Sequence, residues 1–395
     1  MKKKPIAILL VSLMVLSLAM VSGCAKKEAA KVGGTDVIKV GALFNQTGDQ
    51  SSLDVPGLNG FKLAADEINK AGGVLGKKIE VVAIDGKTDQ NACANGASKM
   101  VDVDKVVAVS GLADSNYALA AGAITQKAGI PFLTSGATLP TLPDQVGDYF
   151  FLVPFGDNIQ AYAGAEYAAT DLKAKTAYIL TDKAMDYTMT LSKYFKERFT
   201  KINGPDSILL EDAYQTADVD FSAQIERLKG LKTQPDVLYV ASDPSKCGVI
   251  VKQMRARGIT QPIIGGDGYD TPLLVELGGE GANNGVYFTT HASLDNPSAK
   301  VQNFVKAYQA AYNKAPENAF AALGYDAMYL LADAIKRANS ADPKAIRDAV
   351  ASTSGFAGVT GNISYKNGSR VPTKSVTVLT VKAGKFAFVK EVLPQ

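Results

Sequence analysis

The sequence holds little of the chemistry on which most enzymes depend. Its one histidine, His291 in the stretch TTHASLD, rules out a metal site built from several histidines, and any Ser-His-Asp or Cys-His arrangement would have to use it. The usual glycine-rich signatures of hydrolases and nucleotide-binding enzymes do not occur. Carboxylates are numerous, but no spacing marks a catalytic pair. We therefore expect a protein that is not an enzyme and holds neither a metal nor a cofactor, with His291 in a structural role at a connection between domains.

An excess of one charge sign is also missing. The formal net charge is +3, and the first 23 residues contribute three lysines and no acid, so the rest of the chain is neutral overall. Nucleic-acid binding would require a basic stripe, and we expect no such partner. Beyond residue 23 no apolar run reaches membrane length. The 372 residues that remain of the 395 are too many for one ordinary core, which predicts two domains.

The N-terminal segment is typical of an export signal. Three lysines precede an apolar run over residues 6–20, and the run ends in VSGC. This tetrapeptide resembles a bacterial lipobox, in which the cysteine becomes the lipidated N-terminus. We predict a signal peptide at 1–23, a lipid on Cys24 and a tether at 24–36, which places the protein outside the cytoplasm and anchored to the membrane. The alternatives are an ordinary signal cleaved elsewhere and an uncleaved anchor.

Cysteine is scarce as well. Beyond the lipobox only Cys93 and Cys247 remain. An exported pair favours a disulfide, but these two fall in different runs of the pattern described next. The sequence leaves the bridge open.

From residue 37 short apolar segments alternate with amphipathic ones. VIKVGALF and KIEVVAID are typical of buried strands, and helices are predicted over 115–128 and 299–312 among others. The stretch LNGFKLAADEINKAGG places four apolar residues on one helix face: Leu58, Phe61, Ala65 and Ile68. The alternation restarts near residue 161, and three helices and a β-rich end follow residue 292. Strands alternating with helices form parallel βαβ units, so the sequence predicts the α/β class, with two doubly wound lobes.

Polar residues gather where the predicted strands end. In parallel sheets, ligands lie beyond the carboxyl ends of the strands, near helix N-termini. The stretch GIPFLTSGATLP, residues 129–140, begins as sheet core and ends in small hydroxylic residues that would let a polar ligand group approach the backbone. The same residue types also serve simple turns and helix caps. Composition alone does not decide between the two interpretations.

Five stretches together resemble the branched-chain amino acid type (leucine/isoleucine/valine-binding-like) of solute-binding lipoproteins, which serve ABC importers. They are IKVGALFNQTG, GFKLAADEINKAGGVLGKKIEVVAID, KAGIPFLTSGATLP, DFSAQIERLKGLKTQPDVLYV and VKQMRARGI. The resemblance runs from about Val37 to the C-terminus and rests on the order and spacing of these stretches.

The resemblance implies a type I periplasmic binding protein fold. Two α/β lobes would be joined by three crossovers, with the ligand in the cleft between them. The crossovers would fall near residues 155–157, 290–292 and 361–373. Lobe 1 would comprise residues 37–155 with 292–361, and lobe 2 residues 156–291 with 373–395.

The resemblance also implies a binding site for an amino acid. Backbone N–H groups at a helix N-terminus and two hydroxyls would hold the α-carboxylate as a neutral anion site; the residues are Ser115, Gly136, Ala137 and Thr138. Asp267 would hold the ammonium group, and Tyr187 would complete the closed form. The alternatives are that Asp267 caps a predicted helix over 271–277 and that Tyr187 provides inter-lobe packing.

Three predicted contacts with the ligand side chain are polar. Gln50 and Asp243 stand where the family often has an aromatic residue, and Asp114 stands beside Ser115. These three polar residues disfavour leucine and isoleucine. We expect a monomeric extracytoplasmic receptor that closes on a small polar solute, an amino acid above all, and delivers it to the membrane permease of an ABC importer. The alternatives are a receptor for a small amide or an aliphatic or aromatic acid, a ligand-sensing accessory receptor, and an enzyme of the cleft.

Overall fold

Two open β-sheets organise the chain. The computed structural model describes residues 37–393, so the predicted signal peptide, the lipid on Cys24 and the tether lie outside the described residues. Five parallel strands form the first sheet, around which we define lobe 1. In spatial order they are β2 (Lys78–Asp85), β1 (Val37–Phe44), β3 (Ala108–Gly111), β4 (Phe132–Thr134) and β5 (Phe150–Leu152).

The second sheet, around which we define lobe 2, has seven strands. In spatial order they are β14 (Lys385–Val392), β13 (Val376–Lys382), β10 (Val286–Thr290), β9 (Ile263–Gly265), β8 (Val237–Ala241), β6 (Ala177–Asp182) and β7 (Ile208–Tyr214). The five strands β6 to β10 are parallel, and the C-terminal hairpin adds two antiparallel strands at the β10 edge. The predicted α/β class with two lobes is confirmed.

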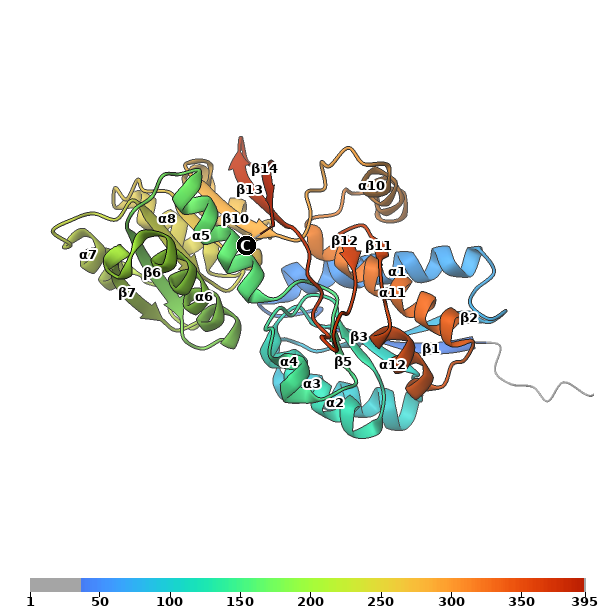
Figure 1. Cartoon of the computed structure of the whole chain (residues 1–395). Helices are drawn as coiled ribbons and strands as arrows, with labels where there is room; N and C mark the ends of the chain where they lie inside the picture. The colour runs from blue at the N-terminus through green and yellow to red at the C-terminus, as the bar shows by residue number, and fades with distance from the viewer. Residues whose placement is uncertain (1–36, 394–395) are drawn as a thin grey trace, which may run out of the picture. The chain divides into compact units, whose positions relative to one another are not determined.

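Helices cover both faces of the first sheet because its strands are apolar on both sides. Along β1, Ala42 and Phe44 pack under α1 (Ser51–Lys70) and α11 (Ala319–Ala338), whereas Leu43 packs under α2 (Gln90–Lys99) and α3 (Ser115–Ala128) (Figure 1). The predicted apolar face of α1 is buried, with Phe61 fully so. The short helix α4 (Leu142–Val146) lies between β4 and β5 in the chain.

The second sheet is covered in the same way. Alternate residues of β8 contact opposite layers: Val237 and Tyr239 face α5 (Asp157–Thr170) and α6 (Asp186–Asn203). Leu238 and Val240 face the other layer, which consists of α7 (Ser222–Lys229), α8 (Cys247–Ala256) and α9 (Leu273–Gly278). A period of two along a strand buried on both faces produces this separation.

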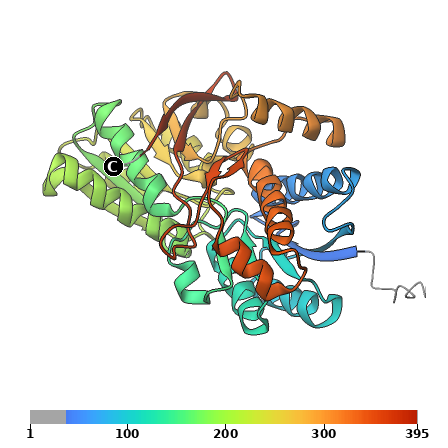
Figure 2. The same cartoon turned by 45° about the vertical axis from the view of Figure 1, so that its right-hand side comes forward.

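The chain passes between the two sheets three times. It leaves β5 for α5, and it leaves β10 for α10 (Ala299–Tyr312), which packs on α1. It then continues through α11, α12 (Pro343–Ala351) and the hairpin β11 (Phe356–Gly358)–β12 (Gly361–Ile363), and returns to β13. Figure 2 follows this third passage from the hairpin to β13. The residue boundaries assigned to the two lobes remain predictions.

Helix α1 begins earlier than the sequence predicts. It starts at Ser51 instead of Leu58 and contains Pro56, a residue that usually interrupts a helix because it has no N–H. The carbonyl of Ser52, four residues before the proline, accepts a hydrogen bond from Asn318 Nδ2 at 3.0 Å. A side chain at the start of α11 therefore replaces the missing backbone donor, and Gln50 becomes the N-cap residue of α1.

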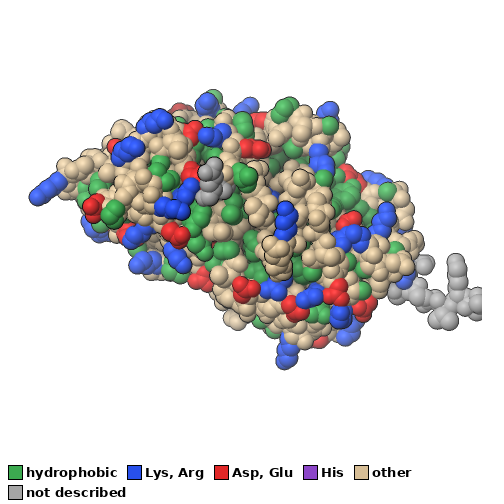
Figure 3. Space-filling view, in the orientation of Figure 1, with side chains coloured by type: hydrophobic (Ala, Val, Ile, Leu, Met, Phe, Trp, Pro, Cys, Tyr) green, Lys and Arg blue, Asp and Glu red, His purple; other side chains and the backbone are tan. Residues whose placement is uncertain are grey.

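Cys93 and Cys247 are buried free thiols, so they form no disulfide. Within residues 37–393, no helix is both long and apolar enough to cross a membrane. Acidic and basic side chains are interspersed on the face shown in Figure 3.

Candidate functional site

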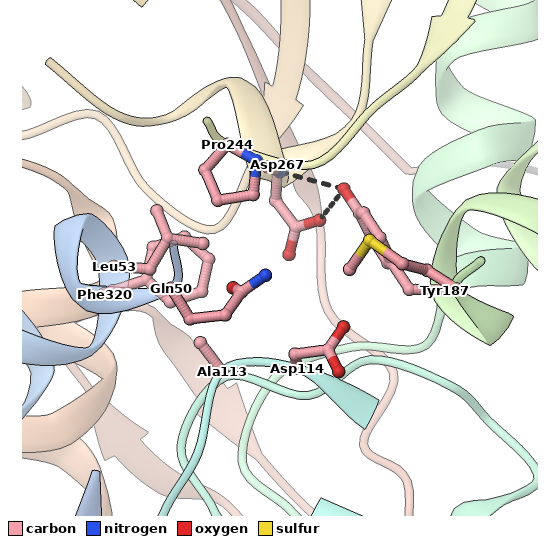
Figure 4. A pocket seen from close by; sticks show the side chains of 10 residues that line it. Gln50, Leu53, Ala113, Asp114, Tyr187, Pro244, Asp267 and Phe320 are labelled. Carbon is pink, nitrogen blue, oxygen red and sulfur yellow. Dashed lines mark hydrogen bonds between the residues drawn. The ribbon is translucent and has the colours of Figure 1, made fainter. Parts of the chain in front are cut away.

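A small cavity lies between side chains of both lobes (Figure 4). It is lined by Gln50, Leu53, Ala113, Asp114, Met185, Tyr187, Pro244, Asp267, Gly268 and Phe320. Its volume is about 10 Å³, which is room for one water molecule at most. Side chains of the two lobes thus nearly fill the space between them at this point.

Asp54 organises the lobe 1 side of the cavity. This buried carboxylate on α1 accepts hydrogen bonds from the backbone N–H groups of Asn45 and Ala113, both at 2.8 Å. Burial raises the pKa of Asp54 to about 8. One side chain therefore ties the loops after β1 and β3 to α1 and places Ala113 and Asp114 at the cavity.

Asp114 and Ser115 begin helix α3 as predicted. Asp114 is the N-cap residue, and its Oδ1 accepts a hydrogen bond from Asn116 N at 2.9 Å. The hydroxyl of Ser115 accepts one from Leu139 N at 3.3 Å, which joins α3 to the loop after β4. Asp114 lines the cavity, whereas Ser115, the next residue in the chain, does not.

The small-residue loop after β4 is bonded mainly to itself. The N–H groups of Gly136 and Ala137 donate to Thr134 Oγ1, at 3.3 and 2.9 Å. A Cβ on Gly136 would come within 2.7 Å of the Cα of Ala113, so only glycine fits this position without a backbone shift. Two of the N–H groups that were predicted to bind the ligand's carboxylate therefore already donate to Thr134 within the loop. They could bind a ligand only if these hydrogen bonds were broken.

Thr138, the last residue of the predicted cradle, connects the loop to the first passage between the sheets. Its carbonyl accepts a hydrogen bond from Asp157 N at 2.8 Å, and its hydroxyl interacts with the carboxyl group of Asp157. Burial raises the pKa of Asp157 well above its ordinary value.

Asp267 is the centre of the lobe 2 side. It lies in a short 3₁₀ turn after β9 and is 2% exposed. Its Oδ1 accepts from Gln160 Nε2 at 2.9 Å and from the Tyr187 hydroxyl at 2.8 Å, and its Oδ2 lies 2.8 Å from His291 Nε2. A carboxylate has about four acceptor positions, so three neutral partners leave room for one more donor.

One of the two sequence-based alternatives for these residues is wrong. The N-cap residue of α9 is Pro272, so Asp267 does not cap that helix. The alternative of inter-lobe packing for Tyr187 stays a prediction. The Tyr187 side chain lines the cavity between the lobes, and its hydroxyl donates to Asp267 and accepts from Gly268 N, both at 2.8 Å. Tyr187 thus positions the carboxylate of Asp267.

His291 stands at the second passage between the sheets, in the structural role predicted for it. Burial lowers the pKa of the imidazole, so the ring is neutral and donates to Asp267. It stacks on Phe155 from the first passage, with ring centroids 4.2 Å apart. The candidate ammonium partner is therefore linked to two of the three passages between the sheets.

Hydrogen bonds join the lobes across the cavity region. Gln50 Nε2 donates to Asp243 Oδ2 at 2.7 Å, and Asp186 N donates to Asn116 Oδ1 at 3.3 Å. Gln50 and Asp243 are buried, at 2% and 1% exposure. The structure thus brings Gln50, Asp114, Tyr187 and Asp267 together at one cavity. Asp243 is hydrogen-bonded to Gln50 but, like the four carboxylate-cradle residues, lies outside the cavity lining.

Buried carboxyl groups dominate the electrostatics of the region. Burial raises the pKa of Asp114 to about 7, and it raises the pKa of Asp243 to about 6. Asp270, which joins the lobes through a hydrogen bond from Ala319 N at 3.1 Å, has its pKa raised by burial to about 7. The folded protein therefore retains protons that the unfolded chain would release.

We expect the melting temperature of the ligand-free protein to fall as the pH rises from about 5 to about 8. Groups with raised carboxyl pKa values stabilise the fold below their ordinary pKa, and this stabilisation is lost as the pH rises through about 6 to 8. Below pH 6.5, His291 has the opposite effect: because burial lowers its pKa, its contribution to stability increases as the pH rises. It is a single group, whereas four buried carboxyl groups act in the other direction. Calorimetry at constant ionic strength measures this slope.

Two variants control the pH experiment. Asp54→Asn should flatten the slope, because it removes the group with a pKa of about 8. Asp236→Asn should leave it unchanged, since backbone and side-chain donors lower the pKa of this surface carboxyl and it does not titrate in the range. A melting temperature that rises with pH would contradict the assignment of the buried acids.

Sequence reasoning missed several residues of this region. Gln160 lies in the first turn of α5 and donates a hydrogen bond to Asp267. This helix begins at Asp157, four residues before Ala161, where the sequence pattern predicts its start. Phe320 and Leu53 line the cavity as members of apolar helix faces, where nothing in the pattern separates them from core residues.

Comparisons with known proteins agree with this architecture. The model of a family described as periplasmic binding protein matches residues 37–385. The chain is 34% identical to the branched-chain amino acid transporter substrate-binding protein LivJ of Streptococcus pneumoniae, solved with isoleucine, with a TM-score of 0.84 over 91% of this chain and 100% of that one.

Two further matches have different ligands in their descriptions. The Leu/Ile/Val-binding protein BraC3 of Rhizobium johnstonii is 27% identical over 350 residues, covering 88% of this chain and 93% of that protein. A solute-binding protein of an ABC transporter from Rhodopseudomonas palustris, solved with 3,4-dihydroxybenzoic acid, is 26% identical with a TM-score of 0.79, over 91% of this chain and 97% of that one.

Proposed function

Because the chain belongs to the periplasmic binding protein family, we propose that it is the solute-binding component of an ABC importer and that its solute is an amino acid. The observation that carries the proposal is Asp267, a buried carboxylate with three neutral partners and an acceptor position left over at the cavity. An ammonium group is the donor that such a position would bind most strongly. The isoleucine and Leu/Ile/Val ligands named for the relatives support the same class.

The ligand would bridge the two lobes. In the proposal Asp267 of lobe 2 binds the ammonium group, and the hydroxyls of Ser115 and Thr138 in lobe 1 bind the α-carboxylate. Contacts on both sides favour the closed arrangement over the open one, so binding shifts the population towards closure. The closed monomer then presents one surface, composed of both lobes, to the permease, and the solute is released unchanged.

An aromatic acid is the second candidate, because one similar structure is described with 3,4-dihydroxybenzoic acid. The surroundings of the cavity disfavour it. Asp114, Asp243 and Asp267 lie in or beside the cavity and are buried, and an anion without an ammonium group would meet only like charge there.

A thermal-shift screen with amino acids, small amides and dihydroxybenzoate tests the function. An amino acid at about a hundredfold over its Kd adds about 2.7 kcal/mol to the unfolding free energy and raises the melting temperature by several degrees. X-ray scattering should show a smaller radius of gyration with the ligand than without it. A shift with dihydroxybenzoate alone would overturn the amino-acid assignment, and binding without compaction would overturn closure.

We propose that Cys24 carries the lipid that anchors this receptor outside the cytoplasm, after cleavage of the signal peptide at 1–23. The supporting observation is the VSGC sequence that ends the apolar run. Cys24→Ser should move the protein from the membrane fraction to the soluble fraction of the cell envelope. Continued incorporation of labelled fatty acid into that variant would contradict the anchor.

A further inference from the structure

Two carboxylates from opposite lobes meet at the cavity region. Asp114 follows β3 in lobe 1 and lines the cavity, and Asp243 follows β8 in lobe 2. They are 4% and 1% exposed. Gln50 lies between the lobes and donates its amide N–H to Asp243. This is the end of the site that the family resemblance assigns to the ligand side chain.

Each of the two acids caps a turn with only one of its oxygens. Asp114 Oδ1 accepts from Asn116 N at 2.9 Å, and Asp243 Oδ1 accepts from Ser245 N at 2.7 Å. The second oxygen of Asp243 contacts Gln50, and Asp114 Oδ2 is buried without a hydrogen-bond partner. Figure 4 shows the Asp114 carboxylate and the Gln50 amide pointing towards the space that they share with Asp267 and Tyr187. Capping of the turn therefore explains the role of only one oxygen in each carboxylate.

The described residues, 37–393, supply no cation in an ion pair with either of these two groups. None of the ion pairs within residues 37–393 includes Asp114 or Asp243. The charges that act most strongly on them are themselves acidic: Asp243 and Asp186 on Asp114, and Asp49 and Asp182 on Asp243. A neutral N-cap residue such as Ser or Asn would cap these turns as well. Burial of a carboxylate without a cation costs free energy, so capping alone does not explain why both positions are Asp.

We propose that the solute carries a second positive charge on its side chain, and that Asp114 and Asp243 bind this charge between the closing lobes. The inference rests on the proposed amino-acid receptor and specifies its substrate class as basic amino acids, with an amine or guanidinium at the end of a flexible chain. In the structure the N–H group of Gln50 donates to Asp243 Oδ2 at 2.7 Å. The N–H groups of the solute replace it there and also reach Asp114 Oδ2.

Isothermal titration with matched ligands tests this inference. L-lysine is compared with L-norleucine, which has the same four-carbon chain without the ammonium group, and L-arginine with the neutral L-citrulline. Wild-type protein should bind at least one basic member about thirtyfold or more tightly than its neutral partner, as expected for a buried charge pair. Asp114→Asn and Asp243→Asn keep the side-chain shape and the cap and should each reduce this ratio towards one.

Asp342→Asn is the matched control, because Asp342 caps α12 through Ala345 N in the same way but is absent from the cavity lining. It should retain the wild-type ratio. Equal affinity for basic and neutral partners would overturn the second charge while leaving the amino-acid receptor intact. Binding of cadaverine but of no amino acid would support the acidic pair and overturn the receptor. Binding of neither class would overturn both.

Discussion

Asp267→Asn should weaken binding of the cognate amino acid about thirtyfold to a few thousandfold, because loss of one partner of a buried charge pair costs about 2–5 kcal/mol. The remaining acceptor position of Asp267 at the cavity is the contact that we assign to the ammonium group. Isothermal titration of wild type and variant, each with the amino acid and its deaminated analogue, measures the effect. Wild type should bind the analogue poorly, and the variant should discriminate little between the two.

Asparagine is the appropriate replacement because Asp267 is buried and holds three side chains. Alanine would leave Gln160, Tyr187 and His291 without their partner, which costs about 1–3 kcal/mol for each unsatisfied group. An asparagine oxygen can still accept from Gln160 and Tyr187. Its NH₂ group can donate to His291 Nε2 in the other tautomer, since Nδ1 of this neutral ring is unpartnered.

Tyr187→Phe is the control for a purely structural effect. It removes the hydroxyl that positions Asp267 and leaves the charge in place. Its loss of affinity should be smaller than that of Asp267→Asn, and its preference for the amino acid over the deaminated analogue should persist. If Asp267→Asn binds the amino acid like wild type at a temperature where circular dichroism shows it folded, the ammonium group is not bound at Asp267.

Gly324→Ala should destabilise the protein by about 3 kcal/mol or more, at the upper end of the range for overpacked cores. Helices α1 and α11 cross so closely that a Cβ on Gly324 would lie 2.0 Å from the carbonyl oxygen of Gly57. The obstacle is backbone, which cannot rotate away, so the helices must move apart. We expect a melting temperature lower by several degrees, measured by calorimetry without ligand.

Gly164→Ala is the matched control within α5. Its Cβ would lie 3.6 Å from the nearest atom, a methyl group of Ile264, which is an ordinary contact. Because alanine is favoured over glycine in a helix by about 0.5–1 kcal/mol, this variant should be as stable as wild type or slightly more stable. A similar loss in both variants would mean that helix propensity and not the α1–α11 crossing controls the result.

The crossing of α1 and α11 also positions the site. Gln50 caps the start of α1, and Phe320 is the second residue of α11. Both line the cavity. Gly324→Ala should therefore also weaken amino-acid binding, although the residue contacts no ligand in the proposal.

The sequence by itself determined the α/β class and most of the elements. The strands predicted from VIKVGALF and KIEVVAID coincide with β1 and β2, and the helices predicted over 115–128 and 299–312 coincide with α3 and α10. The reason is local: apolar runs and amphipathic periods report directly which side of each element is buried. The family resemblance pointed to Asp114, Asp243 and Asp267, and each of them follows a strand of one of the two sheets, where parallel strands place ligand contacts.

Only the tertiary structure decided what these side chains contact. Gln50 and Asp243 are 193 residues apart in the chain, and Gln160 and Asp267 are 107 apart, yet each pair is hydrogen-bonded. The start of α1 depends on Asn318, which bonds the carbonyl left open by Pro56. Composition left the loop after β4 undecided between a ligand cradle and a simple turn, and in the structure Thr134 holds two of its N–H groups. Hydrogen bonds between distant segments leave no periodic trace in a sequence, so the partners of a buried polar group become known only when the chain is folded.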